Sequence, residues 1–516
     1  MVFASPTFLF LFLPLFLAGY YLLPGGRRSG WILVGSWVFY GWWRLDFLLL
    51  LVTASLGAGW IGRRIARSSD AAARRRWTVT GVTAALAVLG YFKYFNFGVN
   101  TASRVVASLG GSTAWATRLW EVVLPVGISF FVFQIISYMV DVHRGTAPEA
   151  RSITDVAAYV SLFPQLVAGP IVRYSEIADQ LRERRHSWSG FAAGARRFSL
   201  GIVRKVLIAD AVAPLVHAVF ASSDPGFAAA WLGVAAYTVQ IYYDFSAYSD
   251  MAIGLGGMMG FRFPENFLRP YHSASITEFW RRWHVTLSSW LRDYLYIPLG
   301  GSRRGSRRTI VNLMTVMVLG GLWHGAAWTF VFWGAWHGLW LVLERVFPVG
   351  GGEPPVRIPA NAPAGARTPT DEPAHAPGRT PSHAEAHAPG RTPSHAEAHA
   401  HLRRGAGRLR RGAGRLYTLG VVMVGWVFFR AESFGDAGRI LTGMVGRNGW
   451  AIGPEILWRI QPGAVAALLV GVLVAAAEPR IFRDGQARPL LLTVLFAWAV
   501  ARLLAASYSP FLYFQF

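Results

Sequence analysis

The chain has 516 residues, of which 53% are hydrophobic and only 15% are charged, whereas soluble globular proteins carry roughly 25% charged residues. The net charge of +23 would suit a nucleic-acid-binding protein, but the arginines gather in short loops beside apolar runs, as on the cytoplasmic side of membrane proteins. This pattern excludes a nucleic-acid-binding protein, and the lack of cysteine excludes disulfides, thiolate metal sites and a cysteine nucleophile.

Apolar runs recur along the whole chain, and about 20 apolar residues are needed to cross a bilayer core roughly 30 Å thick. The first run, Met1–Leu23, has no basic flank and no clear cleavage site, so we expect a retained span. Several runs are short, which favours broken or re-entrant helices shielded by protein or water. The expected spans are Phe8–Leu23, Trp31–Trp43, Asp46–Ile61, Trp77–Phe95, Leu124–Val142, Phe198–Phe220, Ala228–Met259, Ile310–Trp323, Ala327–Phe347, Leu416–Phe429, Pro462–Ala477 and Leu490–Ala506.

The basic loops between these runs predict the topology. With the N-terminus outside, every strong arginine cluster lies in the cytoplasm, as the positive-inside rule requires, and the C-terminus lies outside. The cytoplasmic loops are then residues 24–30, 62–76, 173–197, 261–308, 348–415 and 479–489. We therefore predict an all-α, multi-pass integral membrane protein that contacts anionic lipid headgroups.

One segment, residues 349–415, differs in composition from the rest of the chain. It is rich in Pro, Ala, Gly, His and Arg, and it repeats AHAPGRTPSHAE from Ala374 and Ala386, and LRRGAGR from Leu402 and Leu409. Such a segment buries too little apolar surface to fold. We predict a disordered cytoplasmic insertion between membrane regions 1–348 and 416–516. Its six histidines could bind a metal, but repeat expansion in a linker explains them better, and no metal site is predicted.

Two acidic residues, Asp244 and Asp250, lie inside an apolar run. Ionisable groups are costly in a membrane and usually face a cavity or a partner. Asp244 is therefore a candidate substrate-binding residue, and the alternative for both residues is an ion pair with arginines that holds helices together.

A new helix is expected after Pro264 and Pro270, with Ser275 and Glu278 as a capping box. We expect this helix to continue through His284, which then shares a face with Trp280 by i, i+4 spacing. Its arginines either clamp a polyanionic donor such as a coenzyme or dock on lipid headgroups. These donor-binding candidates are Arg281, Arg282 and Arg292.

A histidine flanked by glycines, His324, follows the next apolar run in the sequence GGLWHG. Glycine permits the close approach of a backbone or a substrate, and histidine transfers protons near neutral pH. A helix–helix hydrogen bond is the structural alternative, but this setting favours a functional role. His337 repeats the Trp-His-Gly triplet thirteen residues later, and it suits a substrate-binding or a supporting role equally.

These segments resemble a known family. DFSAYSDMAIG, FRFPENF, FWRRWHVTLSSWLRDYLYIPLGG and GGLWHGAAWTFVFWGAWHG are similar to the membrane-bound O-acyltransferases, and to their alginate O-acetylation branch in particular. The resemblance runs from Trp37 to Phe516 and omits residues 349–415. It implies a fold of about 10–12 transmembrane or re-entrant helices around a central funnel, in a bacterial cytoplasmic membrane.

The resemblance also implies the catalytic residues, His324 in the Trp-His-Gly motif and His284 in FWRRWH. Trp280, Trp323 and His337 are further candidates for the substrate site. We expect a cytoplasmic acetyl donor, most simply acetyl-CoA, and no tightly bound cofactor. His324 then acts as general base or transient acyl carrier, while His284 orients the thioester or stabilises the oxyanion. The acetyl group is expected to reach an extracytoplasmic polysaccharide such as alginate.

A secreted or periplasmic acetyltransferase or esterase-like partner is expected, because the chain has no Gly-x-Ser-x-Gly motif of its own. Two classes of alternative remain open. The same fold could transfer D-alanyl groups or acylate peptidoglycan or lipid. A non-enzymatic transporter, or a scaffold for polymer export, would need no catalytic histidine, but a transporter is expected to have repeated spans, and none is seen.

Overall fold

The computed structural model describes residues 1–347, 395–477 and 489–505, and within these ranges its regular elements are all helical. Three helical segments are long and apolar enough to cross a bilayer, namely Leu45–Arg67, Ala71–Ser108 and Leu409–Arg430. Three further predicted spans correspond to shorter apolar helices among the described residues, Thr7–Leu22, Pro462–Ala477 and Pro489–Ala505. The prediction of an all-α membrane protein is confirmed.

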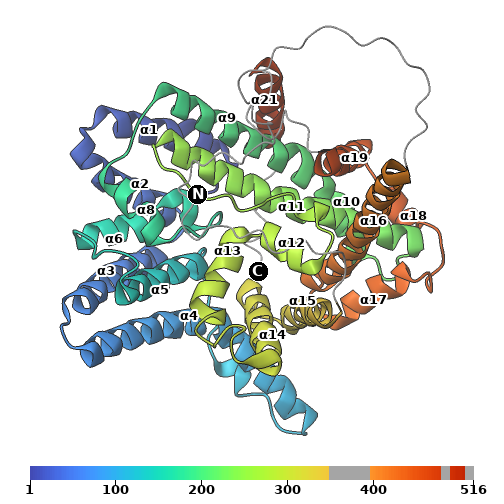
Figure 1. Cartoon of the computed structure of the whole chain (residues 1–516), viewed down its shortest axis with the longest axis horizontal. Coiled ribbons are helices and arrows are strands. Elements are labelled where there is room, and N and C mark those ends of the chain that lie inside the picture. Colours follow the sequence, from blue (N-terminus) through green and yellow to red (C-terminus); the bar gives the residue numbers. More distant parts are fainter. Residues whose placement is uncertain (348–394, 478–488, 506–516) are drawn as a thin grey trace.

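The N-terminal helices form one side of the molecule (Figure 1). Asp70 begins α4 by accepting hydrogen bonds from the backbone N–H groups of Ala73 and Ala72, and these bonds lower the pKa of its carboxyl group. The connection between α3 and α4 is thus only residues 68–70, and the arginines of the predicted loop 62–76 lie on the two helices. The helices here are η1 (Thr7–Phe12), α1 (Leu13–Leu22), η2 (Gly25–Arg27), α2 (Arg28–Gly41), α3 (Leu45–Arg67), α4 (Ala71–Ser108) and η3 (Ala116–Arg118).

The central helices surround α11 (Phe227–Met258), which runs beside α9 (Trp188–Arg204) in Figure 1. Glycines bring the two backbones together, since a Cβ on Gly194 would lie 2.6 Å from the carbonyl oxygen of Gly254. The expected span Phe198–Phe220 is divided between α9, η4 and α10. The other elements of this region are α5 (Ile128–Arg144), α6 (Ile153–Val160), α7 (Phe163–Leu166), α8 (Tyr174–Arg182), η4 (Lys205–Ala209) and α10 (Asp210–Ala221).

The segment that was expected to be one helix around His284 is divided into two. The first, α12 (Ile276–Arg282), ends before Trp283, and His284 is the N-cap of α13 (Val285–Leu291) with φ of 45°. The expected shared helical face of Trp280 and His284 is therefore wrong. Asn266 and its neighbours hold His284 in a left-handed conformation, and spacing along the sequence cannot reveal that tertiary cause.

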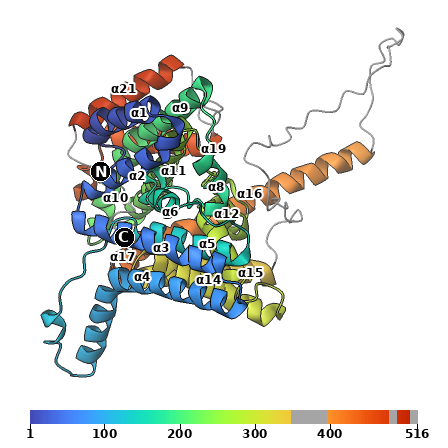
Figure 2. The same ribbon diagram turned by 90° about the vertical axis from the view of Figure 1, so that its left-hand side faces the viewer.

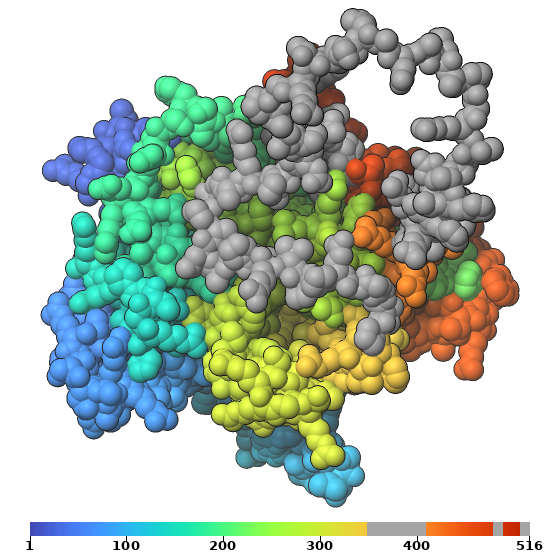
Figure 3. Space-filling view, viewed as in Figure 1, coloured from blue at the N-terminus to red at the C-terminus, as the bar shows by residue number. Residues whose placement is uncertain are grey.

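The C-terminal helices other than α21 lie on the side of the molecule opposite α1–α3 (Figure 3), whereas α21 (Pro489–Ala505) packs against α9. The helix α16 (His395–Arg430) begins before the predicted boundary at residue 416, because Leu, Ala and Arg favour helix there, and it projects from the body in Figure 2. Residues 349–394 of the predicted insertion lie outside the described residues. The remaining helices are η5 (Pro270–His272), η6 (Arg292–Tyr296), α14 (Gly305–His324), α15 (Trp328–Val346), α17 (Phe434–Met444), α18 (Pro454–Leu457), α19 (Pro462–Ala477) and α21 (Pro489–Ala505).

Candidate active site

The position of His324 depends on close packing between α14 and α15. His324 is the last residue of α14 and is only 4% exposed. A Cβ on Gly321 would collide with the carbonyl oxygen of Phe330, and a Cβ on Gly325 would collide with the Phe330 ring. The glycines around His324 therefore allow the close approach that the sequence indicated.

The carbonyl groups at the end of α14 receive hydrogen bonds from α4. Lys93 Nζ donates to the carbonyl oxygens of Trp323 at 2.5 Å and His324 at 3.2 Å, and the Tyr94 hydroxyl donates to that of Leu322 at 3.0 Å. The last carbonyls of a helix lack intrahelical partners and carry partial negative charge. Lys93 and Tyr94 therefore fix the backbone that carries His324. Lys93 was not among the residues predicted from the sequence, although a single lysine inside an apolar span is a usable signal.

Two tryptophans connect the three candidate histidines, which are all buried. The Trp323 ring lies 4.9 Å from the ring of His324 and 6.0 Å from that of His284, between ring centroids. The Trp333 ring lies 5.0 Å from both His324 and His337. The structure thus brings together rings that are up to 53 residues apart in the sequence, and we call His284, His324 and His337 the histidine cluster.

The surroundings of His284 are polar on one edge of its ring. Its Nδ1 lies 3.1 Å from Asn266 Oδ1 and 3.4 Å from the backbone N of Leu287. Its Nε2 is buried and has no hydrogen-bond partner among the residues that the structure describes. His284 and Arg269 have positive φ without being glycine, and strain of this kind is often found at functional sites.

Comparisons with known proteins point to one family. The model of the membrane-bound O-acyltransferase family matches residues 140–348, a range that contains the whole histidine cluster. A probable alginate O-acetylase AlgI of Azotobacter vinelandii is 42% identical over all of both chains, and that of Pseudomonas putida is 41% identical, also over all of both chains. The peptidoglycan O-acetyltransferase of Helicobacter pylori is 31% identical over 87% of this chain and 80% of its own.

The chain belongs to the membrane-bound O-acyltransferase family. It is therefore an acyltransferase, and the recognition of the family from the sequence is confirmed. Lys93 lies outside the range that the family model matches, but it contacts the backbone of His324, which lies inside that range.

The three candidate donor-binding arginines of the acyltransferase lie nearer the surface than its histidine cluster. Arg281 is exposed. Arg282 forms an ion pair with Glu278 at 2.6 Å, and Arg292 forms one with Asp293 at 2.6 Å. Salt bridges at the surface contribute little to stability, so these side chains can rearrange toward an anionic donor at low cost. Their role in donor binding stays a prediction.

The acidic residues inside α11 of the acyltransferase have basic partners. Asp244 pairs with Lys205 at 2.6 Å, and both side chains are nearly inaccessible. Asp250 pairs with Arg197 at 3.0 Å and Arg204 at 2.6 Å. These pairs join α11 to α9 and η4, as the alternative of helix-joining ion pairs predicted. That alternative named only arginines, whereas the partner of Asp244 is a lysine. Whether Asp244 also binds substrate stays a prediction.

A buried carboxylate that the sequence analysis did not select holds the start of α12 in the acyltransferase. Glu344 of α15 accepts hydrogen bonds from the backbone N–H groups of Ile276 at 2.5 Å and Thr277 at 2.8 Å. Ser275 caps the helix as predicted, but the Glu278 carboxylate bonds the backbone N–H of Ala274 rather than that of Ser275. The candidate Trp280 then lies 5.2 Å from His337, between ring centroids.

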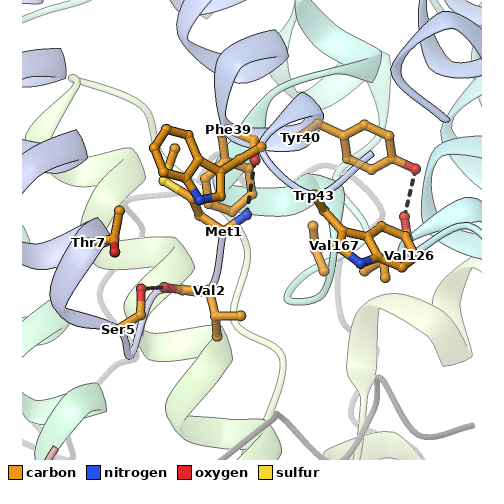
Figure 4. A pocket seen from close by; sticks show the side chains of 10 residues that line it. Met1, Val2, Ser5, Thr7, Phe39, Tyr40, Trp43, Val126 and Val167 are labelled. Carbon is orange, nitrogen blue, oxygen red and sulfur yellow. Dashed lines mark hydrogen bonds between the residues drawn. The ribbon is translucent and has the colours of Figure 1, made fainter. Parts of the chain in front are cut away.

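A cavity of about 340 Å³ lies elsewhere in the acyltransferase, where the chain start meets α2 (Figure 4). Aromatic side chains such as Phe39 and Trp43 line it, and the Tyr40 hydroxyl donates a hydrogen bond to the carbonyl oxygen of Val126 beside it. None of its lining residues belongs to the histidine cluster. We therefore assign no role in acyl transfer to this cavity.

Proposed function

We propose that the protein passes an acetyl group from a cytoplasmic donor, acetyl-CoA in the simplest case, across the membrane for O-acetylation of an extracytoplasmic polysaccharide such as alginate. The observation that carries this proposal is the buried histidine cluster in a chain that is 42% identical over its full length to a probable alginate O-acetylase. In this proposal the protein is a multi-pass protein of a bacterial cytoplasmic membrane, and a secreted partner completes transfer to the polymer.

The chemistry needs a group that moves a proton in a site shielded from water, because water would hydrolyse an activated acyl group. Buried imidazoles meet this need, since histidine exchanges protons near neutral pH. His324 has the most constrained position, because packing on α15 and hydrogen bonds from α4 fix the end of α14. We therefore place His324 at the acyl group, with His284 nearby, since the Trp323 ring lies close to both histidines.

The test replaces His324 by Ala in the native host and measures ester-linked acetyl groups on the exported polymer. We expect acetylation to fall at least 100-fold, because loss of one side chain that stabilises the reacting acyl group costs about 10²–10³-fold in rate. His217→Ala is the matched control, because His217 is an exposed histidine on α10. Acetylation that persists with His324→Ala, at normal membrane levels of the variant, would remove His324 from the mechanism.

Peptidoglycan is a second candidate acceptor, because the relative from Helicobacter pylori is named a peptidoglycan O-acetyltransferase. Supplying cells with isotope-labelled acetate, and then measuring the label on the purified polymer and on muropeptides, separates the two acceptors. Label on the polymer supports the proposal, and label on muropeptides alone favours the second candidate. A D-alanyl ester on either acceptor would identify a different acyl group.

A further inference from the structure

We infer that Asn266 is a positioning residue that holds the hydrogen of His284 on Nδ1, so that Nε2 presents a lone pair to the reacting groups. Asn266 lies before η5, is 1% exposed, and has its Oδ1 3.1 Å from His284 Nδ1. The nitrogen of a histidine that carries the hydrogen is set by the hydrogen bond that this nitrogen makes.

The hydrogen-bond network fixes which way the amide of Asn266 points. The backbone N–H of Ile171 can only donate, and it donates to Thr286 Oγ1 at 2.9 Å. Thr286 Oγ1 lies 2.9 Å from Asn266 Oδ1, and the backbone N–H of Thr286 approaches the same atom at 3.4 Å. The backbone N–H of Thr286 can only donate, so we assign the atom that it approaches as the amide oxygen, which can also accept from the Thr286 hydroxyl.

The other side of the amide agrees with this orientation. Asn266 Nδ2 lies 3.1 Å from the hydroxyl oxygen of Ser249 on α11, and an NH₂ group can donate to that oxygen. His284 Nδ1 faces an oxygen that can only accept, so Nδ1 must carry the hydrogen for the contact to be favourable. In the neutral imidazole, Nε2 is then an acceptor.

One contact competes with this assignment. The backbone N–H of Leu287 points at His284 Nδ1 from 3.4 Å and would need an unprotonated Nδ1. This contact is longer than the 3.1 Å contact between His284 Nδ1 and Asn266 Oδ1, so we assign the hydrogen on Nδ1 to the shorter bond. Asn266 therefore determines the tautomer, and its removal would let Leu287 N–H impose the opposite one.

This assignment makes His284 the base for the acceptor hydroxyl instead of the expected oxyanion stabiliser, which needs hydrogen on Nε2, and it leaves His324 as the residue that holds the acyl group. In a step that rests on the proposed function, the acceptor hydroxyl oxygen attacks the carbonyl carbon of an acetyl thioester. As the C–O bond forms, the hydroxyl proton passes to His284 Nε2. The C–S bond then breaks, and the departing thiolate takes that proton, which regenerates the neutral ring.

The experiment observes the tautomer directly, with protein containing ring-¹⁵N histidine in lipid vesicles. The resonances of His284 are identified among the 13 histidines by their loss in His284→Asn, because Asn tolerates left-handed φ. We expect protonated Nδ1 and unprotonated Nε2 in the wild-type protein. Hydrogen on Nε2 would overturn the inference, and this measurement needs neither acyl transfer nor a variant of Asn266.

Two variants of Asn266 extend the test. Asn266→Leu should shift the hydrogen to Nε2 and lower kcat by about 10- to 100-fold, the loss typical when the partner of a functional histidine is removed. Asn266→Asp should keep hydrogen on Nδ1 and move the acidic limb of the pH–rate profile to higher pH, because a carboxylate favours the protonated ring.

A matched control is Asn312→Leu, because Asn312 is also 1% exposed but bonds the backbone carbonyl of Gly301 instead of a histidine. This variant should have the same His284 tautomer and the same pH–rate profile as the wild-type protein. An unchanged tautomer in folded Asn266→Leu would contradict the inference even where the rate falls. A wild-type protein that has its hydrogen on Nδ1 but transfers no acetyl group would instead contradict the proposed function and not this inference.

Discussion

At the scale of single residues, the two Trp-His-Gly triplets have different surroundings. His324 ends α14 beside the hydrogen bonds from Lys93, whereas His337 lies inside α15 against α16. Both ring nitrogens of His337 are buried without a hydrogen-bond partner among the described residues. A buried polar group without a partner costs about 1–3 kcal/mol. A hydrogen bond from a His337 ring nitrogen to a bound substrate atom would offset this cost.

Close packing holds the His337 ring in place, and Gly425 of α16 is essential to it. A Cβ on Gly425 would lie 2.8 Å from His337 Nε2, whereas a Cβ on Gly420 of the same helix would meet nothing within 4 Å. We expect Gly425→Ala to destabilise the protein by about 1–3 kcal/mol through overpacking, and Gly420→Ala to stabilise it by up to about 1 kcal/mol. Thermal unfolding in detergent measures the stability of both variants. Equal midpoint temperatures for Gly425→Ala and Gly420→Ala would contradict the packing argument.

At the scale of helices, the site depends on where short helices begin and end. α12 begins on a carboxylate from α15, α13 begins at the left-handed His284, and α14 ends on donors from α4. The sequence predicted Ser275 as a cap because that signal is local. It could not predict Glu344, Asn266 or Lys93 as partners, because each lies far along the chain from the helix end that it contacts.

The cap on α14 leads to a prediction about Lys93. Lys93→Met leaves the carbonyl oxygens of Trp323 and His324 without their donor, which costs about 1–3 kcal/mol, so the end of α14 should loosen and acyl transfer should fall. Hydrogen exchange of the amides of residues 318–326 measures the loosening. Tyr94→Phe removes a single bond, to Leu322, and should have a smaller effect. If Lys93→Met shows the amide hydrogen exchange and the acyl-transfer rate of the wild-type protein, Lys93 does not stabilise the end of α14.

At the scale of the whole molecule, composition and apolar runs were enough to predict an all-α membrane protein, and the motif residues predicted the family. The convergence of His284, His324 and His337 required the resemblance, because no spacing rule brings rings from α13, α14 and α15 to the same two tryptophans. Ion pairs inside the membrane region were foreseen as an alternative. Their partners were not, because Lys205 and Asp244 lie 39 positions apart.

The Lys205–Asp244 pair tests whether this long-range contact serves the fold or the substrate. Lys205→Met leaves the buried Asp244 charge without its lysine, which should destabilise the protein by about 3–5 kcal/mol, whereas replacing a whole buried pair by apolar residues is often nearly neutral. The double variant, Lys205→Met with Asp244→Leu, should therefore recover most of the lost unfolding temperature. Asp210, the second partner of Lys205, is 23% exposed, so water can solvate it.

Acyl transfer by the recovered double variant then separates the two roles of Asp244. If Asp244 only joins α11 to η4, the double variant should transfer acyl groups at a rate within a few-fold of the wild type. If Asp244 binds substrate, the rate should stay low although the unfolding temperature has recovered, because the carboxylate is gone. A double variant that unfolds as early as Lys205→Met alone would contradict the proposed energetics of the pair.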